Sequence, residues 1–424
     1  MRIETARSER HAARPRWPLV GMLCATATAG YICRVNVSTA GALLMQEFHL
    51  SQIEMGRVFS AFLLGYAIFQ VPGGALADRW GARRVLAMAA WAWVILTALQ
   101  AATGWGPWAG TAAGVLGGFI TLRFLMGVAA APTYPAAAQG VSRWVPAVFQ
   151  GRATGIVIGS VGLGSAIAPP LVSSVMVAWG WRAALLISAL PALAIALSWR
   201  LFPEPPAAPR LPPIASPIAP PSAPRHPPSS LRSRSFALLT LSYSLQGYVG
   251  YVFVSWFYLY LVQERHFGLL AGAWMSSLPW ILSIVSIPLG GFVADRLAAG
   301  RLGPTWGPRA VAMTGMAGSG ALISIGAHTG SPVMAAIALA LATALVLCVE
   351  GPFWSSVTRM QGGRSGTAGG IMNTGCNIGG LISPALTPVL AASIGWEAAL
   401  HVAAALAVLA ALLWLGIGRP TSTA

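Results

Sequence analysis

Long apolar runs alternate with short polar segments along almost the whole chain. The first run begins near Pro18, and runs in the second half cover about 236–262, 268–294, 309–328, 331–355, 366–393 and 396–418. A helix needs about 20 apolar residues to cross a bilayer. The pattern therefore predicts an all-α membrane protein with about twelve transmembrane helices and both ends on the same side.

A polar segment in the first half has a counterpart in the second half. Gly73–Arg79 and Gly290–Arg296 both read Gly-Gly, three residues, Asp-Arg, at a shift of 290 − 73 = 217 residues. Gly164 and Gly379 form a second pair at a nearly equal shift. Repetition at a fixed interval indicates a duplicated unit. We expect a bundle over residues 1–202, a Pro-rich cytoplasmic linker over 203–235 and a second bundle over 236–424.

Composition identifies lipid as the main solvent of the protein. The chain is 56% hydrophobic and 8% charged, with a mean hydropathy of +0.69, whereas soluble domains carry about 25% charged residues. The formal net charge is +16. The arginines lie between apolar runs, as expected for topology signals in a bilayer, so no nucleic acid is expected as a partner. Their placement predicts cytoplasmic termini in the plasma (inner) membrane.

The pattern of potential ligands and nucleophiles does not indicate an enzyme. The four cysteines lie inside apolar runs, without metal-ligand spacing. His328 and His401 stand alone, and no Ser/His/Asp set or phosphate-binding loop is present. We expect no catalytic residues, no metal and no cofactor. The competing class of a membrane enzyme or receptor is therefore not favoured.

Two arginines lie inside predicted spans that contain no acid, Arg34 in the first and Arg123 in the fourth. A charged side chain in the middle of a bilayer costs at least about 2.5 kcal/mol on insertion scales. If both faced one cavity, they would form a positive site for a carboxylate, which a guanidinium binds with two parallel hydrogen bonds. The alternative is that each binds backbone carbonyls or reaches an interface.

Several groups in the second half have two interpretations. Glu350 lies well inside a span, so it could bind a proton during transport or pair with an arginine near the cytoplasmic end. The aromatic and polar candidates could contact substrate or only pack between helices. These candidates are Tyr251, Trp256, Trp354, Ser355, Asn373 and Asn377.

The segment Gly73-Gly74-x-x-x-Asp78-Arg79-x-Gly81-x-Arg83-Arg84 resembles the signature between the second and third helices of the major facilitator superfamily. The second copy, the central linker and the expected number of spans agree with it. Other stretches are similar to the anion:cation symporter family, which includes permeases for sugar acids, tartrate and phthalate as well as carriers for sialic acid and vesicular glutamate. Those stretches are Tyr31–Ala40, Phe59–Gly74, Leu122–Pro135, Tyr251–Arg265 and Asn373–Pro384.

The resemblance implies roles for particular residues. It implies that Arg34 holds a substrate carboxylate, that Tyr31 and Tyr66 line the cavity, that Arg123 takes part in anion recognition, and that Asn377 contacts substrate. We add Asn36 to the substrate candidates because it belongs to the first of these stretches. The residues expected to control opening on the cytoplasmic side are Asp78, Arg79, Gly81, Arg83, Arg84, Asp295 and Arg296.

Two departures from the resemblance leave the energy coupling open. Proton-coupled relatives often carry an acid before the first-helix arginine and a Glu-Ala-Pro motif on the fourth helix. Here these positions hold Cys33 and Ala130-Ala131-Pro132. We expect a monomeric secondary active transporter for a small organic anion, such as a sugar acid or another carboxylate, by symport or by another mode of coupling. The alternative is a multidrug or metabolite exporter on the same fold, which would favour an acid in its cavity.

Overall fold

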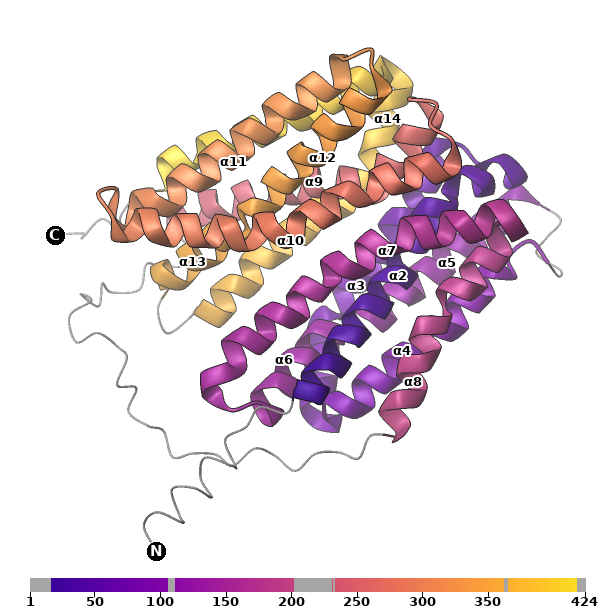
Figure 1. Cartoon of the computed structure of the whole chain (residues 1–424), viewed down its shortest axis with the longest axis horizontal. Coiled ribbons are helices and arrows are strands. Elements are labelled where there is room, and N and C mark those ends of the chain that lie inside the picture. The colour runs from indigo at the N-terminus through magenta and orange to yellow at the C-terminus, as the bar shows by residue number, and fades with distance from the viewer. Residues whose placement is uncertain (1–16, 106–110, 202–230, 232, 362–364, 418–424) are drawn as a thin grey trace, which may run out of the picture.

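The computed structural model of the chain is all-helical over the residues that it describes, 17–105, 111–201, 231, 233–361 and 365–417. The N-terminal half contains α2 (Trp17–Phe48), α3 (Gln52–Trp80), α4 (Ala82–Ala101), α5 (Ala112–Ala130), α6 (Thr133–Trp144), α7 (Ala147–Ser188) and α8 (Leu190–Leu201). The C-terminal half contains α9 (Arg234–Gln263), α10 (Leu269–Ala299), α11 (Gly303–His328), α12 (Pro332–Cys348), α13 (Glu350–Gln361), α14 (Ser365–Leu413) and a short 3₁₀ turn at Trp414–Gly416. Figure 1 shows the halves as two groups of helices side by side.

The described helices include ten that are long and apolar enough to cross a membrane. The two longest, Phe149–Leu201 and Thr367–Gly416, are each long enough for two passes. Each contains one glycine with a positive φ, Gly180 at 80° and Gly395 at 85°, a conformation that other residues rarely adopt. With the chain reversing at these glycines, the ten candidate spans supply twelve passes, in agreement with the expectation from the sequence.

The outer surface of the two groups is apolar. Many large hydrophobic side chains are exposed, among them Ile68, Val71, Val177, Val285 and Leu289. Exposed apolar side chains in such number are unfavourable in water and mark contact with lipid or a partner. The multi-pass membrane protein expected from composition is therefore confirmed.

Two membrane passes are interrupted near their middle, at related positions in the two halves. Between α5 and α6 the helix is interrupted by a turn at Ala131 and Pro132, and between α12 and α13 by a turn at Val349, with backbone angles that stay in the right-handed helical region. A glycine of α3 or α10 packs against each interruption. A Cβ atom added at Gly73 would lie 2.9 Å from Pro132, and one added at Gly290 would lie 1.9 Å from the carbonyl oxygen of Cys348. The duplicated Gly-Gly pairs thus allow a close approach of helices.

The two halves contact each other from one end of the molecule to its middle. We define the near end as the end that holds Trp17 and Ile417, and the far end as the end that holds Phe48 and Gln263. Helices α3 and α14 pack together, as do α7 and α10. A Cβ atom added at Gly56, near the far end of α3, would lie 2.3 Å from the carbonyl oxygen of Pro384. In Figure 1 the halves meet at the far end and diverge toward the near end.

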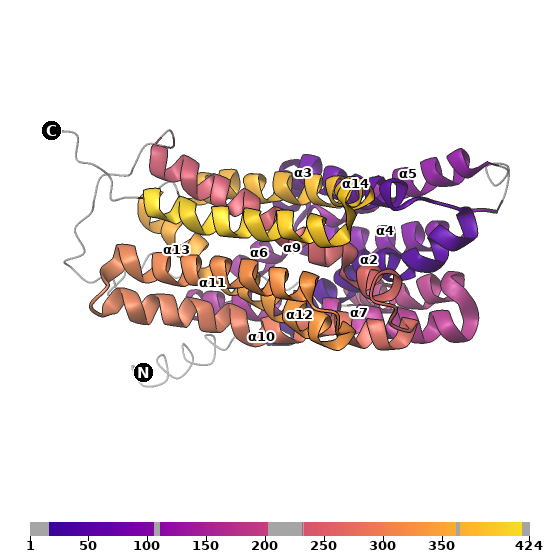
Figure 2. The ribbon, with the colours of Figure 1, turned by 90° about the horizontal axis from the view of Figure 1, so that it is seen from above.

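Hydrogen bonds between the halves are found at the far end and the middle of the described helices. At the far end, the Gln52 amide donates to Gln263 at 3.2 Å, and Trp396 Nε1 donates to Gln52 at 3.2 Å. The Ser277 hydroxyl of α10 donates to the carbonyl of Ala166 on α7 at 2.7 Å. Figure 2 shows the same arrangement from another direction, with α7 running beside α10. The structure is therefore closed at the far end.

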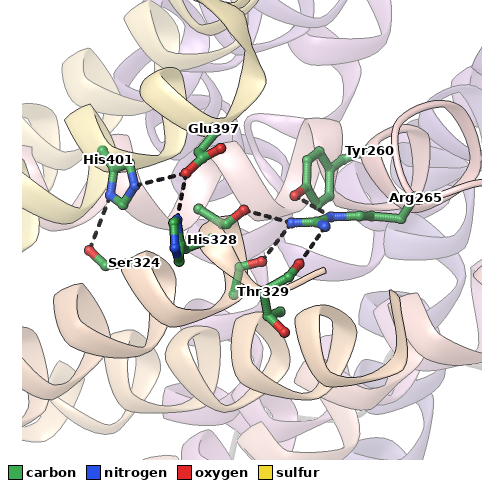
Figure 3. Close-up of polar contacts among 9 residues, drawn as sticks. Tyr260, Arg265, Ser324, His328, Thr329, Glu397 and His401 are labelled. Atoms are coloured by element: carbon green, nitrogen blue, oxygen red, sulfur yellow. Dashed lines mark hydrogen bonds and ion pairs between the residues drawn. The ribbon is translucent and has the colours of Figure 1, made fainter. Parts of the chain in front are cut away.

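Polar contacts tie together the helices of the C-terminal half at the far end (Figure 3). Arg265, which follows α9, donates hydrogen bonds of 2.7–2.8 Å to the last carbonyls of α11, at Gly326, Ala327 and Thr329. A cation at a helix C-terminus satisfies orphan carbonyls and interacts favourably with the helix dipole. These contacts join the end of α9 to the end of α11.

One expectation about the histidines was wrong. His328 and His401, which are distant in sequence, both contact Glu397, at 3.0 and 3.8 Å (Figure 3). All three side chains are substantially exposed. No sequence motif marks this cluster, because packing of α11 against α14 brings it together.

The four cysteines, Cys24, Cys33, Cys348 and Cys376, are free thiols. Most of the predicted linker, 203–235, lies outside the described residues, so its course stays a prediction.

Candidate functional site

Arg34 lies near the middle of α2, with its guanidinium between the two halves. Its Nη1 donates to the hydroxyl of Tyr31 at 3.2 Å, one turn earlier on the same helix. Its Nη2 donates to the hydroxyl of Tyr251, on α9 of the other half, at 2.7 Å. Both partners are neutral, so the positive charge of Arg34 is hydrogen-bonded but not neutralised by them.

Aromatic rings surround this guanidinium. Its central carbon lies 5.1 Å from the ring centroid of Tyr31, 4.8 Å from that of Phe62 and 5.6 Å from that of Tyr66. A cation within about 6 Å of an aromatic face is stabilised by the ring quadrupole. The Tyr134 hydroxyl donates to that of Tyr31 at 3.3 Å. The rings hold Arg34 in place and supply hydroxyl groups for a polar ligand.

Arg123 of α5 is the second positive group, and it is 3% exposed. Its Nη2 donates to the backbone carbonyl of Arg34 at 2.8 Å, so the carbonyl-bound alternative is observed for one nitrogen. Its Nε and Nη1 have no hydrogen-bond partner. Its central carbon lies 5.0 Å from the ring centroid of Phe62, whose ring Arg34 also contacts. An unpaired buried guanidinium is unfavourable, so its free donors favour an anionic ligand.

The two arginines share a small cavity and lack an acidic partner. Among the described residues, neither forms an ion pair with Asp or Glu. The cavity has a volume of about 20 Å³, room for roughly one water-sized group. It is lined by residues of α2, α3, α5 and α9, including Arg34, Phe62, Arg123 and Tyr251. A ligand larger than one water-sized group would require lining residues such as Tyr251 to move.

A second polar contact between the halves lies close to the tyrosines around Arg34. The Asn377 amide of α14 donates to Gln70 of α3 at 3.3 Å. Gln70 in turn donates to the Tyr66 hydroxyl at 3.4 Å. Nearby, the Ser60 hydroxyl of α3 donates to the carbonyl of Leu381 on α14 at 2.9 Å and holds the two helices together. Asn377 therefore lies within the same polar network as the tyrosines around Arg34.

Other predicted substrate contacts lie elsewhere. Asn36 is fully buried and donates to Ser188 of α7, at 2.9 Å, inside the N-terminal half. Trp256 is also fully buried and donates to the carbonyl of Pro384 at 3.2 Å. Trp354 Nε1 donates to Glu350 at 3.3 Å, and the Ser355 hydroxyl accepts from Arg359 at 3.0 Å. Asn373 is half-buried on α14, toward the near end from Asn377. The structure does not group these five side chains around Arg34.

The predicted gating residues all lie at the near end. Arg83 donates to the carbonyls of Trp199 and Arg200 at 2.9 and 3.0 Å, so it ties the start of α4 to the end of α8. Asp78 accepts a 3.4 Å contact from the Gln139 amide of α6. The others are Arg79, Gly81, Arg84, Asp295 and Arg296, of which the four charged side chains are exposed. In this conformation the described contacts of Asp78 and Arg83 stay within the N-terminal half.

Three residues of the polar and aromatic surroundings of Arg34 were not singled out from the sequence. Phe62 resembles any other apolar residue of a span, and only its position between two guanidiniums distinguishes it. Tyr134 and Gln70 carry a weak signal, since each is a polar group inside or beside an apolar run. A search for every hydrogen-bonding side chain in the spans would have included both.

The chain matches known proteins along nearly its whole length. The family model described as Major Facilitator Superfamily matches residues 22–384. Among curated relatives, the probable sulfoacetate transporter SauU of Cupriavidus necator is 31% identical, over 88% of this chain and 86% of that protein. The hexuronate transporter of Bacillus subtilis is 25% identical, over 96% of both chains.

Solved structures show the same fold. A bacterial homologue of the human lysosomal transporter Spinster, in an inward-facing and occupied conformation, superposes with a TM-score of 0.74 at 16% identity, over 96% of this chain and 97% of that one. A D-xylose–proton symporter superposes with a TM-score of 0.74 at 15% identity, over 95% and 98%. The chain belongs to the major facilitator superfamily and is a transporter of its anion:cation symporter type, not an enzyme.

Proposed function

We propose that the chain carries a small organic anion across the membrane by alternating access, with the anion bound at Arg34 and Arg123. The observation that carries the proposal is the pair of guanidiniums at the interface of the two halves, without an acidic partner among the described residues. A guanidinium binds a planar carboxylate with two parallel hydrogen bonds. Relatives named for sulfoacetate and hexuronate support a ligand that carries a carboxylate, with or without a second acidic group.

The remaining substrate contacts follow from the same network. Tyr31, Tyr66 and Asn377 lie close enough to contact the rest of a bound anion, and Tyr251 would contact it from the C-terminal half. These residues come from both halves, as alternating access requires, because the ligand must interact with each half as they rock about it.

The distribution of arginines supports an orientation. In the described part of the chain, most of the arginines near helix ends lie at the near end, including Arg79, Arg83, Arg143, Arg296 and Arg359. The far end carries few, including Arg57 and Arg182. By the positive-inside rule the near end would be cytoplasmic in the plasma (inner) membrane, and we expect both termini on that side. The conformation closed at the far end is then inward-facing.

Closure of the near end in the opposite state would involve the predicted gating residues. We expect the charged residues there, Asp78, Arg79 and Arg84 in one half and Asp295 and Arg296 in the other, to approach when that end closes. Residues 1–202 and 236–424 would then move as two bodies joined by the linker. No nucleic acid takes part, and the monomer is the working unit.

Thermal-shift measurements on purified protein test the proposed ligand class. We expect glucuronate, galactonate or sulfoacetate to raise the melting temperature, because a ligand that binds the native state at 100 times its dissociation constant stabilises it by about 2.7 kcal/mol. A matched cation, tetraphenylphosphonium, is expected to have no effect. Stabilisation by the cation and not by any of the anions would support the multidrug exporter instead.

A further inference from the structure

The C-terminal half contains a carboxyl group placed directly at a helix interruption. Helix α12 ends at Cys348, Val349 is a single turn residue with near-helical backbone angles, and α13 begins with Glu350. Gly290 of α10 packs against this point, where any side chain would collide with the carbonyl of Cys348. The interruption is therefore held by packing, and it places the Glu350 side chain between α9 and α14.

The internal duplication relates this position to the interruption in the N-terminal half. The shift of 217 residues (290 − 73) that relates Gly73 to Gly290 places Pro132 at Val349, next to Glu350. In the N-terminal half the interruption is apolar, Ala130-Ala131-Pro132. In the C-terminal half the same shift matches these residues to Leu347-Cys348-Val349, and the next residue, Glu350, matches Thr133. A carboxyl group is thus present at only one of two related interruptions.

The partners of Glu350 are neutral. The Tyr243 hydroxyl donates to Oε2 at 2.7 Å, the Gln246 amide donates to Oε1 at 3.1 Å, and Trp354 Nε1 donates to Oε2 at 3.3 Å. No described basic side chain forms an ion pair with it, in contrast to Glu47, which pairs with Arg182 at 2.7 Å. The alternative of pairing with an arginine is therefore not seen among the described residues.

Other titratable or charged groups near Glu350 are few. Tyr243 of α9 and Cys376 of α14 face it, and both are neutral near pH 7. On its own pass, Cys348 precedes it by two residues. Charged groups on the packed helices, Asp295 of α10 and Arg359 of α13, lie farther toward the near end. Glu350 is thus the carboxyl of this region that can change charge by binding a proton.

A polar path leads from Glu350 to the anion site. Gln246 Oε1 accepts a 3.8 Å contact from the thiol of Cys376. The next residue on α14, Asn377, donates to Gln70, which donates to Tyr66 beside Arg34. Helices α9 and α14 also pack closely here, since a Cβ atom added at Gly247 would lie 2.4 Å from the carbonyl of Cys376. A change at Glu350 can therefore alter the position of Asn377.

We propose that Glu350 binds the proton that is transported together with the organic anion, so that the proton site lies in the C-terminal half and the anion site mainly in the N-terminal half. The step is the binding of a proton from water to the carboxylate on one side of the membrane and its release to water on the other, with no other bond changed. For a monoanion such as glucuronate, one proton and one anion then cross with no net charge, whereas sulfoacetate, which carries two negative charges, leaves one of them uncompensated. Glu350 is half-buried. This inference rests on the proposed anion transport.

Proteoliposomes that contain the full chain and an internal pH dye test the proposal, with glucuronate and sulfoacetate as probes. For the wild type we expect anion addition to acidify the lumen and an inward proton gradient to drive accumulation. For Glu350→Gln, which keeps the shape and one donor group, we expect gradient-driven accumulation to fall at least about tenfold. Anion counterflow, which needs no net proton movement, should stay within about twofold of the wild type. The matched control is Glu264→Gln, at an exposed acid after α9 that should leave proton flux unchanged.

Each outcome decides the assignment. Proton-driven accumulation by Glu350→Gln at the wild-type level would overturn it, as would wild-type counterflow without any proton flux. A wild type that shows no counterflow of either anion contradicts the proposed function itself, and the assignment falls with it. Retention of proton flux in Glu350→Asp, which keeps a carboxyl group, is the expected rescue.

A measurement on the wild type avoids dependence on variant folding. Dicyclohexylcarbodiimide reacts with protonated carboxyl groups in apolar surroundings, and the adduct can be located by mass spectrometry. We expect labelling at Glu350 that decreases as pH is raised. Absence of label at Glu350 at every pH, with label at other carboxyls, would contradict a protonated state.

Discussion

Replacing Arg34 with alanine is expected to abolish binding and transport of the organic anion while the protein still folds. Removing one member of a buried charged contact costs about 2–5 kcal/mol, and each 1.4 kcal/mol is a tenfold change in affinity. The expected weakening is therefore roughly thirtyfold to several thousandfold. Thermal shifts with glucuronate and sulfoacetate, together with counterflow in proteoliposomes, measure it.

Two further variants separate the charge of Arg34 from its shape. Arg34→Lys keeps the positive charge but loses the planar group that reaches Tyr31 and Tyr251 at once. We expect weakening between that of wild type and alanine. Arg57→Ala, at an exposed arginine of α3, is the matched control and should transport normally. Normal counterflow by Arg34→Ala would show that the anion binds elsewhere.

Gly56→Trp is expected to stop transport by preventing closure of the far end. A Cβ atom at this position would lie 2.3 Å from the carbonyl of Pro384, which belongs to the other half, so a backbone group would have to move. Because α3 and α14 pack along this line, an indole ring would force the two halves apart. The protein would remain in the state that is open at the far end.

Reactivity at the two ends of the molecule measures this shift. A single cysteine introduced at Gln52 in a background without the native cysteines should react faster with a membrane-impermeant maleimide in the Gly56→Trp protein than in its parent. The matched control is Gly117→Trp, because a Cβ atom at Gly117 has open space around it. Net uptake by the Gly56→Trp protein, with an unchanged rate of maleimide reaction, would contradict the close contact of α3 with α14.

The features that the sequence predicted correctly depend on solvent and repetition. The length of each apolar run, the scarcity of charge and the repeated Gly-Gly pairs predicted the passes, the lipid environment and the superfamily. These properties are visible without a structure, because a bilayer requires every long span to be apolar and internally hydrogen-bonded. The interruptions at Pro132 and Val349 were not predicted, because each apolar run was expected to form one helix, although the helix after each interruption is more polar than the one before it.

The site was predicted only in part. The sequence singled out Arg34, Arg123, Tyr31 and Tyr66 because polar groups inside a span stand out against an apolar background. The structure brings them together, whereas their binding of a substrate stays a prediction. Asn36 and Trp256 stood out for the same reason, yet they point into helix contacts away from Arg34: Asn36 bonds to Ser188, and Trp256 bonds to Pro384 and packs against Phe59 of the other half. Helix rotation decides which of two buried directions a side chain takes, and the pattern of residues does not encode it.

By itself, the sequence determined that this chain crosses a membrane many times, that it consists of two related halves, and that positive charge without a matching acid lies inside the first half. The tertiary structure decided that Phe62 lies between two guanidiniums, that Tyr251 and Asn377 reach across from the second half, and that Glu350 has neutral partners. The physical reason is that burial in lipid depends on local composition. Contacts between residues hundreds of positions apart depend on how helices rotate and pack.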